Sequence, residues 1–301
     1  PADLYSNSTV ALHAGSGELA WYYQHLPGDD WDADHTHERV LVRTRLSPDP
    51  KAVKWINPGI KPGEIRDVLV HIGEGGGMWL LDRGSGEFLW AMPFPVDVPE
   101  FNIANIDVET GATEINWRNV FKQDGDSVLT CFHNTRSYWP MAYHPDTNSV
   151  YVAFHDYCLG MTADLSSPSG WKDRAGRLRP GVSPDKAYAL AKVDLATGRL
   201  TRLYEGGVPG NGAVLATAGK LIFWGDMNRR FRAFDAENGD VLWETILGGV
   251  IQMSTISYAV DGKQYIAVMT GDGKSATRNP VEIANLTVPR GHNAIYVFAL
   301  P

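Results

Sequence analysis

Apolar and polar positions along this chain form short alternating segments instead of long helical runs. The segments are rich in β-branched and aromatic residues, and Gly, Asn and Asp turns separate them. No stretch of helix length holds an apolar period of about 3.6 residues, so the pattern predicts an all-β protein. The clearest predicted strands are "DVLVHIG" (67–73), "GMWLLDR" (77–83), "SVYVAFH" (149–155), "KLIFWG" (220–225), "QYIAVMTG" (264–271) and "AIYVFAL" (294–300).

One hairpin pattern recurs within this β framework. An apolar strand ends at Asp or His, a Gly-containing turn follows, and the return strand closes on Trp. Gly permits the positive φ of a tight turn, Asp can accept hydrogen bonds from the turn backbone, and Trp can pack on the neighbouring repeat. Such a recurrence is typical of a β-propeller. Clear copies are "ALHAGSGELAW" (11–21), "LLDRGSGEFLW" (80–90) and "AFDAENGDVLW" (233–243), and weaker copies are "NIDVETGATEI" (105–115) and "KVDLATGRLTRLY" (192–204).

The repeats are unevenly spaced, which indicates insertions between them. The segment "MTADLSSPSGWKDRAGRLRPGVSPDKAY" (161–188) is the clearest insertion, because its Ser, Gly, Pro and charged residues are typical of loops. The 301 residues are enough for one large domain or two small ones.

Charge and hydropathy narrow the function classes. The formal net charge of −8 gives no electrostatic support to a nucleic-acid partner or an anionic membrane. No apolar run approaches the roughly 20 residues of a membrane helix, so we expect no membrane span. The first residues, "PADLYSNSTV", lack the basic start and apolar core of a signal peptide. We therefore expect a cytosolic, mature or truncated chain.

Two cysteines, Cys131 and Cys158, occur in the sequence. They can be two buried thiols or one disulfide that closes a loop of about 27 residues. Composition alone leaves both interpretations open.

An acidic segment, "LPGDDWDADHTHERVLV" (26–42), lies between two apolar segments. Trp31 stands among its aspartates and is costly to leave in water, so we expect the segment to lie against the body of the protein. The ionisable residues in and beside it are His25, Asp29, Asp30, Asp32, Asp34, His35, His37 and Glu38.

Three hypotheses fit this segment. It can be a solvated acidic loop. It can be a transition-metal site, because imidazole and carboxylate groups suit Zn or Fe, although the spacing matches no hydrolase motif. It can also be a hard-cation site with a carboxylate base, because Asp32 and Asp34 would project to the same side of an extended backbone. The transition-metal hypothesis would use His25, Asp32, Asp34, His35 and His37.

The ordered motifs of the chain resemble the quinoprotein alcohol dehydrogenases, which use pyrroloquinoline quinone (PQQ). The resemblance covers nearly the whole chain in the family's order. It implies an eight-bladed propeller of four-stranded, W-shaped sheets with the cofactor on its axis. Residues 1–301 resemble the C-terminal half, as one propeller domain of about four blades, and the N-terminal half would be absent or supplied by another chain. The motifs are "LYSNSTVALHAGSGELAWYYQHLPGDDWDAD", "GGGMWLLDRGSGEFLWAMPF", "YWPMAYHPDTNSVYVAFHDYC", "LATAGKLIFWGDMNRRFRAFDAENGDVLWETILGG", "ISYAVDGKQYIAV" and "NAIYVFALP".

The resemblance also implies roles for the acidic segment. Asp32 matches the general base that takes the alcohol proton while a hydride passes to the quinone. Asp34 matches the additional aspartate of lanthanide-dependent members, where calcium enzymes usually have Ala. Asp32 and Asp34 would both bind the cation, a lanthanide or calcium ion, which acts as a Lewis acid on the quinone. Cys131 and Cys158 resemble a disulfide pair of the family.

The implied cofactor contacts depart from the usual pattern. Where many members have Lys or Arg against the quinone, this chain has Glu74, which would repel the cofactor's carboxylates. Arg136 or Arg230 would then supply the displaced positive charge, and the alternative for Arg230 is an outer-surface position on a strand. The residues expected to contact PQQ are Arg136, Ser137, Arg230, Val250 and Ile251.

The resemblance implies a periplasmic PQQ-dependent alcohol dehydrogenase. It would oxidise primary alcohols, polyols or sugars to aldehydes and pass electrons to a cytochrome c. A homodimer is one option for its assembly. The alternative from another class is a non-catalytic β-propeller scaffold of the cell envelope, which has no reason to hold "W-D-A-D".

Overall fold

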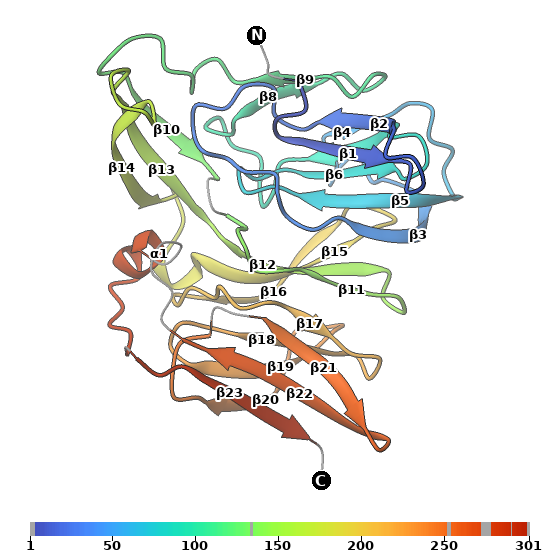
Figure 1. Cartoon of the computed structure of the whole chain (residues 1–301), viewed down its shortest axis with the longest axis vertical. Helices are drawn as coiled ribbons and strands as arrows, with labels where there is room; N and C mark the ends of the chain where they lie inside the picture. The colour runs from blue at the N-terminus through green and yellow to red at the C-terminus, as the bar shows by residue number, and fades with distance from the viewer. Residues whose placement is uncertain (1–3, 133–134, 252–253, 272–277, 290, 300–301) are drawn as a thin grey trace. The chain divides into compact units, whose positions relative to one another are not determined.

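The described residues form an almost entirely β structure, as the pattern predicted (Figure 1). The computed structural model describes residues 4–132, 135–251, 254–271, 278–289 and 291–299. The helical elements in these ranges are a 3₁₀ helix, η1 (Pro184–Lys186), and a short α-helix, α1 (Arg278–Ile283). None of the described helices has the length and apolar content needed to cross a membrane.

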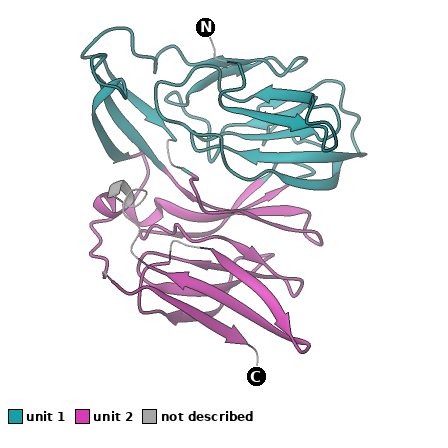
Figure 2. Cartoon of the chain, viewed as in Figure 1, with its two compact units in different colours: residues 1–135, 157–177, 195–199 teal, residues 136–156, 178–194, 200–301 magenta. Residues whose placement is uncertain are grey.

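The chain divides into two compact units (Figure 2). Unit 1 comprises residues 1–135, 157–177 and 195–199, and unit 2 comprises residues 136–156, 178–194 and 200–301. The acidic segment and both cysteines belong to unit 1. The residues expected to contact PQQ belong to unit 2.

Unit 1 is built on a five-stranded sheet with the order β3-β5-β6-β7-β4. Its strands are β3 (Val40–Leu46), β4 (Trp55–Ile56), β5 (Glu64–Ile72), β6 (Met78–Asp82) and β7 (Phe88–Met92). The unit also contains the antiparallel hairpins β1 (Ser8–Leu12) with β2 (Leu19–Gln24) and β8 (Ile103–Ile106) with β9 (Thr113–Ile115). A three-stranded sheet joins β10 (Ser127–Cys131), β13 (Tyr157–Ala163) and β14 (Trp171–Leu178).

Unit 2 contains two four-stranded antiparallel sheets, the form expected of a propeller blade. The first joins β11 (Ala142–His144), β12 (Ser149–His155), β15 (Tyr188–Asp194) and β16 (Leu200–Gly206). The second joins β17 (Leu215–Ala216), β18 (Leu221–Gly225), β19 (Arg230–Asp235) and β20 (Val241–Ile246). A three-stranded sheet follows, made of β21 (Thr255–Val260), β22 (Lys263–Thr270) and β23 (Ala294–Ala299).

The segment 161–188 is more ordered than its loop-like composition indicated. β14 lies within it and pairs with β13, which in turn pairs with β10. Residues along β14 alternate between exposed and half-buried positions, with few large apolar side chains among them. The strand therefore gives only a weak period-two signal in the sequence, and its pairing in the folded chain supplies the order.

The recurring hairpin has the geometry that the sequence predicted. At the turn after β6, the Asp82 carboxylate accepts hydrogen bonds from the backbone N–H groups of Gly84 and Ser85, at 2.9 and 3.0 Å. Gly86 has φ 76°, in the left-handed region. A Cβ atom at Gly86 would lie 2.5 Å from the ring of Trp21. The Trp of one hairpin therefore packs on the turn of the next, and only Gly fits there.

An aromatic lock of the same kind uses Tyr23. Its hydroxyl donates to the backbone oxygen of Gly111 at 2.7 Å. A Cβ atom at Gly111 would lie 2.7 Å from the Tyr23 ring and 2.6 Å from Phe88. The weaker sequence repeat at 105–115 is thus held in the same way as the turn at Gly86, with Tyr in place of Trp.

Candidate functional site

The acidic segment lies against unit 1, as expected from Trp31. The Trp31 side chain is completely buried, and its Nε1 donates to the backbone oxygen of Asn119 at 2.7 Å. Asn119 is held in turn by its own side chain, which donates to Asn102 Oδ1 at 3.2 Å. The hydroxyl of Thr130 also donates to Asn102 Oδ1. The segment is therefore anchored to β10 through a chain of buried polar groups.

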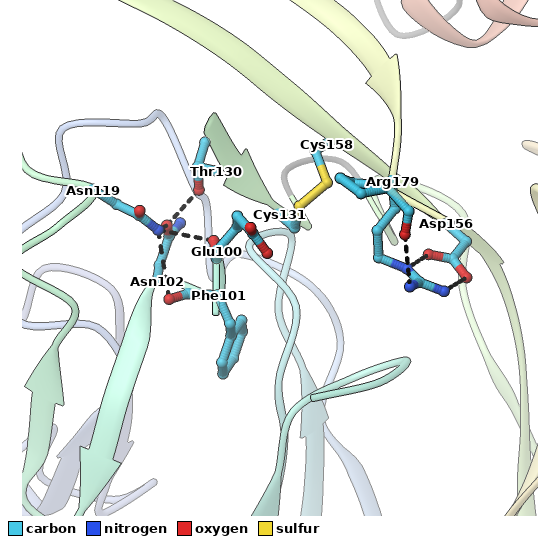
Figure 3. Close-up of a disulfide and its surroundings, with 10 residues drawn as sticks. Glu100, Phe101, Asn102, Asn119, Thr130, Cys131, Asp156, Cys158 and Arg179 are labelled. Atoms are coloured by element: carbon cyan, nitrogen blue, oxygen red, sulfur yellow. Dashed lines mark hydrogen bonds and ion pairs between the residues drawn. A yellow bond between two sulfur atoms is a disulfide. The ribbon is translucent and has the colours of Figure 1, made fainter. Parts of the chain in front are cut away.

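The disulfide lies next to this anchor (Figure 3). Cys131 and Cys158 are bonded to each other, and they face each other directly in the antiparallel pair of β10 and β13. Cys131 follows Thr130, and its backbone N–H donates to the oxygen of Glu100 at 2.9 Å. The disulfide interpretation of the two cysteines is confirmed, and the bond fixes the strand that holds the acidic segment.

Two of the four aspartates accept hydrogen bonds from backbone N–H groups. Asp29 accepts hydrogen bonds from the N–H groups of Trp31, at 2.8 Å, and Ala33, at 2.9 Å. Asp30 accepts a hydrogen bond from the N–H of Phe121 at 3.1 Å. Asp29 therefore shapes the segment itself, as in an Asx turn, and Asp30 ties the segment to Phe121.

Asp32 is placed differently from Asp29 and Asp30. Its side chain is 51% exposed, and its Oδ2 pairs with Nη1 of Arg174 on β14 at 2.9 Å. The Arg174 guanidinium also lies over the ring of Trp171, 5.4 Å from its centre. The φ angle of Asp32 is 63°, so the backbone is left-handed at this residue. The assumption of an extended backbone from Asp32 to Asp34 is therefore wrong.

The carboxylates of Asp32 and Asp34 nevertheless influence each other. Partial burial raises the pKa of the Asp34 carboxyl, and the charges of Asp32 and Asp29 raise it further, while Arg174 opposes them. Repulsion between neighbouring carboxylates is relieved when a cation binds between them, and oxygen ligands suit hard cations such as calcium and lanthanides. The donor set at Asp32 and Asp34 thus fits the expected metal.

Glu74 lies next to the segment through the backbone. Its N–H donates to the oxygen of Asp34 at 3.0 Å, and the residue is buried. The following residue, Gly75, has no room for a side chain, since a Cβ atom would lie 2.9 Å from the Cβ of Ala33. The Glu74-Gly75 pair, a departure from the family pattern, therefore packs directly on the acidic segment.

Three histidines of unit 1 form a buried cluster, which we call the histidine triad: His25, His35 and His71. One ring nitrogen from each lies within 4.8 Å of those of the other two. Nδ1 of His35 and Nε2 of His71 are 3.0 Å apart. Burial holds the pKa of His25 well below its ordinary value and lowers that of His35 to about 3. The positive charge of Arg39 lowers both pKa values further, so these two rings are neutral at pH 7.

The triad changes the transition-metal hypothesis for the segment. It includes His25 and His35, but its third member is His71 on β5, which the sequence did not single out. His37, Asp32 and Asp34 are not part of it. Arg174 was also missed as the partner of Asp32, because the two residues are 142 positions apart.

The residues of unit 2 that were expected to contact PQQ are mostly buried. Arg136, Ser137 and Ile251 are fully buried, and Val250 is 1% exposed. Ile251 packs against Gly225 at the end of β18, where an added Cβ would lie 2.5 Å from it.

Arg230 differs from the other predicted contacts. Its side chain is 38% exposed and forms an ion pair with Glu244 on β20, the last strand of its sheet. Its charge therefore has a partner within the blade. This pairing favours the alternative of a strand residue at the outer surface.

Comparisons with known proteins agree with the motifs. Residues 1–110 and 189–266 match the family model of the PQQ glucose/ethanol/alcohol dehydrogenase β-propeller domain. The chain is 30% identical to a quinoprotein ethanol dehydrogenase of Pseudomonas aeruginosa, over 99% of this chain and 47% of the relative. It is 29% identical to the quinohemoprotein alcohol dehydrogenase ADH-IIG of Pseudomonas putida, over 90% of this chain and 38% of the relative.

A third relative and a solved structure extend the comparison. The chain is 30% identical to the 1-butanol dehydrogenase (cytochrome c) of Thauera butanivorans, over 90% of this chain and 38% of the relative. A europium-containing methanol dehydrogenase shares the fold, with a TM-score of 0.78 and 24% identity over 98% of this chain and 53% of that structure.

The family match covers well over half of the 301 residues, and it includes the acidic segment and the clear hairpin repeats. The chain spans less than half the length of the curated relatives described above. The observed sheets, the repeat and the family match agree, and the chain belongs to the family of PQQ glucose/ethanol/alcohol dehydrogenase β-propeller domains.

Proposed function

We propose that this chain is the part of a PQQ-dependent alcohol dehydrogenase that carries the proton-accepting carboxylate and two ligands of the cofactor's cation. The observation that carries the proposal is the division among the four aspartates. Asp29 and Asp30 bind backbone N–H groups of the segment and its surroundings. Asp32 instead is half exposed and meets a cationic side chain, and Asp34 is coupled to it by charge.

The chain's own residues contribute proton transfer and positioning. When bound, the quinone accepts the hydride and the cation polarises its carbonyl. The Asp32 carboxylate accepts the proton of the alcohol hydroxyl, which requires hydrogen-bond distance to the substrate oxygen. Arg174 orients Asp32 through the 2.9 Å ion pair. Trp31 directly precedes Asp32 in the sequence. Its buried side chain keeps the segment fixed within unit 1.

Asp32 and Asp34 would hold the cation, with a lanthanide preferred over calcium. A trivalent ion carries one more charge than calcium, and the second carboxylate offsets it. Burial and the charge of Asp32 raise the pKa of Asp34, and a bound ion would offset the repulsion between the two carboxylates.

For the quinone we propose contacts from Arg136, Ser137, Val250 and Ile251, with Arg136 as the positive group. Arg136 is buried and cationic, and an anionic cofactor carboxylate is a suitable neighbour for a guanidinium. Arg230 is not among these contacts, because its guanidinium pairs with Glu244.

The substrate would be a primary alcohol, a polyol or a sugar, and the electron acceptor a cytochrome c in the periplasm. The name of the Thauera butanivorans relative supports the acceptor, and the disulfide supports an oxidising compartment. The family match favours the enzyme over the envelope scaffold.

The test is turnover of Asp32→Asn in the complete protein, reconstituted with PQQ and metal. Asn tolerates the left-handed backbone of position 32, and its amide cannot accept the proton. We expect turnover of a primary alcohol to fall about 10²–10⁴-fold while quinone and metal remain bound. The measurement is reduction of an artificial electron acceptor, together with the absorption spectrum of bound quinone.

The matched control is Asp30→Asn, which makes the same chemical change two residues away. Its amide oxygen can still accept the hydrogen bond from Phe121 N–H. We expect turnover within a few-fold of the parent protein. Full activity in Asp32→Asn, or equal losses in the two variants, would contradict the proposed base.

A further inference from the structure

The histidine triad is the densest group of metal-ligating side chains in the described residues, and the proposed quinone chemistry does not use it. His25 directly follows β2, His35 lies within the acidic segment, and His71 lies on β5. All three rings are buried. Their candidate ligand nitrogens lie within 4.8 Å of one another, and no carboxylate belongs to the group.

The spacing of the rings is close to that of a metal site. Zn–N bonds of about 2.0–2.1 Å place neighbouring nitrogens of a tetrahedral site roughly 3.4 Å apart. Nδ1 of His35 and Nε2 of His71 are 3.0 Å apart, so an ion would require only a small separation of these two rings. The third nitrogen needs a modest approach from its position within 4.8 Å.

The hydrogen bonds of His25 leave one nitrogen for a ligand role. Its Nε2 is 2.8 Å from the hydroxyl of Thr9. Its Nδ1 is buried and has no hydrogen-bond partner among the described residues. A buried polar atom of this kind calls for an explanation, and a metal ion is one that uses the lone pair of a neutral imidazole.

We propose that His25, His35 and His71 form a binding site for a divalent first-row transition metal such as Zn²⁺. The site is separate from the oxygen-liganded cation at Asp32 and Asp34, because imidazole nitrogens suit Zn²⁺ and related ions, whereas calcium and lanthanides take oxygen. His25 coordinates through Nδ1, and its Nε2–H donates to Thr9. That outer hydrogen bond fixes the ring, as is common around metal-binding histidines.

We expect an ion to enter the triad at His35, which lines a hollow at the surface of unit 1. A hollow of about 690 Å³ is lined by Thr9, His35 and Arg39, among other residues of unit 1. The Arg39 guanidinium donates to the backbone oxygens of Ser8, at 3.2 Å, and His35, at 2.6 Å, and these hydrogen bonds hold it in place beside the hollow. A water molecule from the hollow would supply the fourth ligand.

The bound metal would fasten the acidic segment to the sheet. His35 immediately follows Asp34, His71 belongs to β5, and His25 belongs to the end of the first hairpin. One ion therefore ties three chain segments together and limits the motion of Asp34. This role is structural, since none of the three rings is proposed to touch the substrate.

The experiment uses Co²⁺ and Zn²⁺ alone with the metal-free 301-residue chain. We expect one equivalent of Co²⁺ to give the visible absorption bands of a four-coordinate nitrogen site, and Zn²⁺ to displace it and raise the melting temperature. His71→Gln should lose the bands and the thermal shift. Thr9→Val keeps all three ligands and should weaken Co²⁺ binding about 10–100-fold.

Two controls make the result specific. His144→Gln alters a buried histidine of unit 2 that is bonded to the oxygen of Thr217 at 3.0 Å, and it should leave Co²⁺ binding unchanged. La³⁺ should not displace Co²⁺. The far-ultraviolet circular dichroism of each metal-free variant reports whether it folds, and Thr9→Val decides the question if His71→Gln does not.

The proposal is overturned by any of three results. The first is no saturable Co²⁺ binding by the folded parent chain. The second is unchanged binding in folded His71→Gln or in Thr9→Val. The third is displacement of Co²⁺ by La³⁺, which would place the ion at the carboxylates.

Discussion

At the scale of single residues, the sequence identified the acidic segment but not the division of labour within it. The four aspartates look alike in the sequence, and only the fold shows that Asp29 and Asp30 bind backbone N–H groups. The ion pair of Asp32 with Arg174 joins positions 142 residues apart, and no local sequence pattern predicts such a contact. His71 was missed for a related reason, since it reads as one polar residue in an apolar strand.

Asp34 gives a residue-scale prediction about metal choice. In the complete protein, Asp34→Ala should lose lanthanide-supported turnover by roughly tenfold or more and shift the preference towards calcium, because one carboxylate of the pair is gone. The measurement is turnover of metal-free enzyme to which La³⁺ or Ca²⁺ is added. Asp34→Asn separates charge from shape, since its amide oxygen can still reach the ion, and we expect an intermediate loss with La³⁺.

Unchanged lanthanide-dependent turnover in Asp34→Ala would remove the ligand role. An equal loss with both metals would assign Asp34 to the shape of the segment instead of to the trivalent ion.

At the scale of elements, the hairpins were predictable because their determinants are local. The Asp82 carboxylate binds N–H groups two and three residues ahead, and Gly86 adopts the φ that the turn requires. The strand β14 was concealed by its composition, and α1 is too short for an apolar period to show. Local sequence chemistry therefore predicts the hairpin repeat. Strands that depend mainly on pairing with neighbouring strands are identified only in the folded structure.

The glycines of two equivalent turns test the aromatic lock. Gly17 and Gly86 have nearly the same φ, 75° and 76°. An added Cβ meets nothing within 4 Å at Gly17 but lies 2.5 Å from the Trp21 ring at Gly86. Gly17→Ala should cost about 1–2 kcal/mol, the strain of a left-handed Ala. Gly86→Ala should cost about 1–3 kcal/mol more, because Trp21 must move.

The measurement is the midpoint of urea unfolding for the two variants and the parent chain, with the slope of the transition as a check on cooperativity. Because Gly17→Ala carries the backbone strain alone, the difference between the variants isolates the packing of Trp21. Equal destabilisation would mean that the Trp ring does not lock the turn.

At the scale of the whole molecule, the sheet β21-β22-β23 has an uncovered apolar face. Ile256, Ala267 and Val297 lie opposite one another across its three strands, so their side chains share one face. Met269 and Ile295 form the next pair on that face. Ile256 is 55% exposed and Ile295 66% exposed. Soluble proteins rarely leave such a patch in water, so we expect further protein to cover it.

The last prediction concerns the 301-residue chain alone. It spans 38–47% of the length of the curated relatives described above. The exposed apolar face of its sheet β21-β22-β23 is what we expect of a propeller blade whose neighbouring blade is absent. Because the rest of a propeller would supply the other part of the cofactor's surroundings, the isolated chain with La³⁺ should bind PQQ much more weakly than the complete protein and should not turn over.

Parallel titrations of PQQ, followed by absorption, measure the affinity, and acceptor reduction measures turnover. If the proposed remainder of the propeller covers the face of Ile256 and Val297, mixing it with this chain should restore PQQ affinity and turnover, and Val297→Lys should impair the restoration. Alcohol oxidation at the full rate by residues 1–301 alone would show that this chain is sufficient.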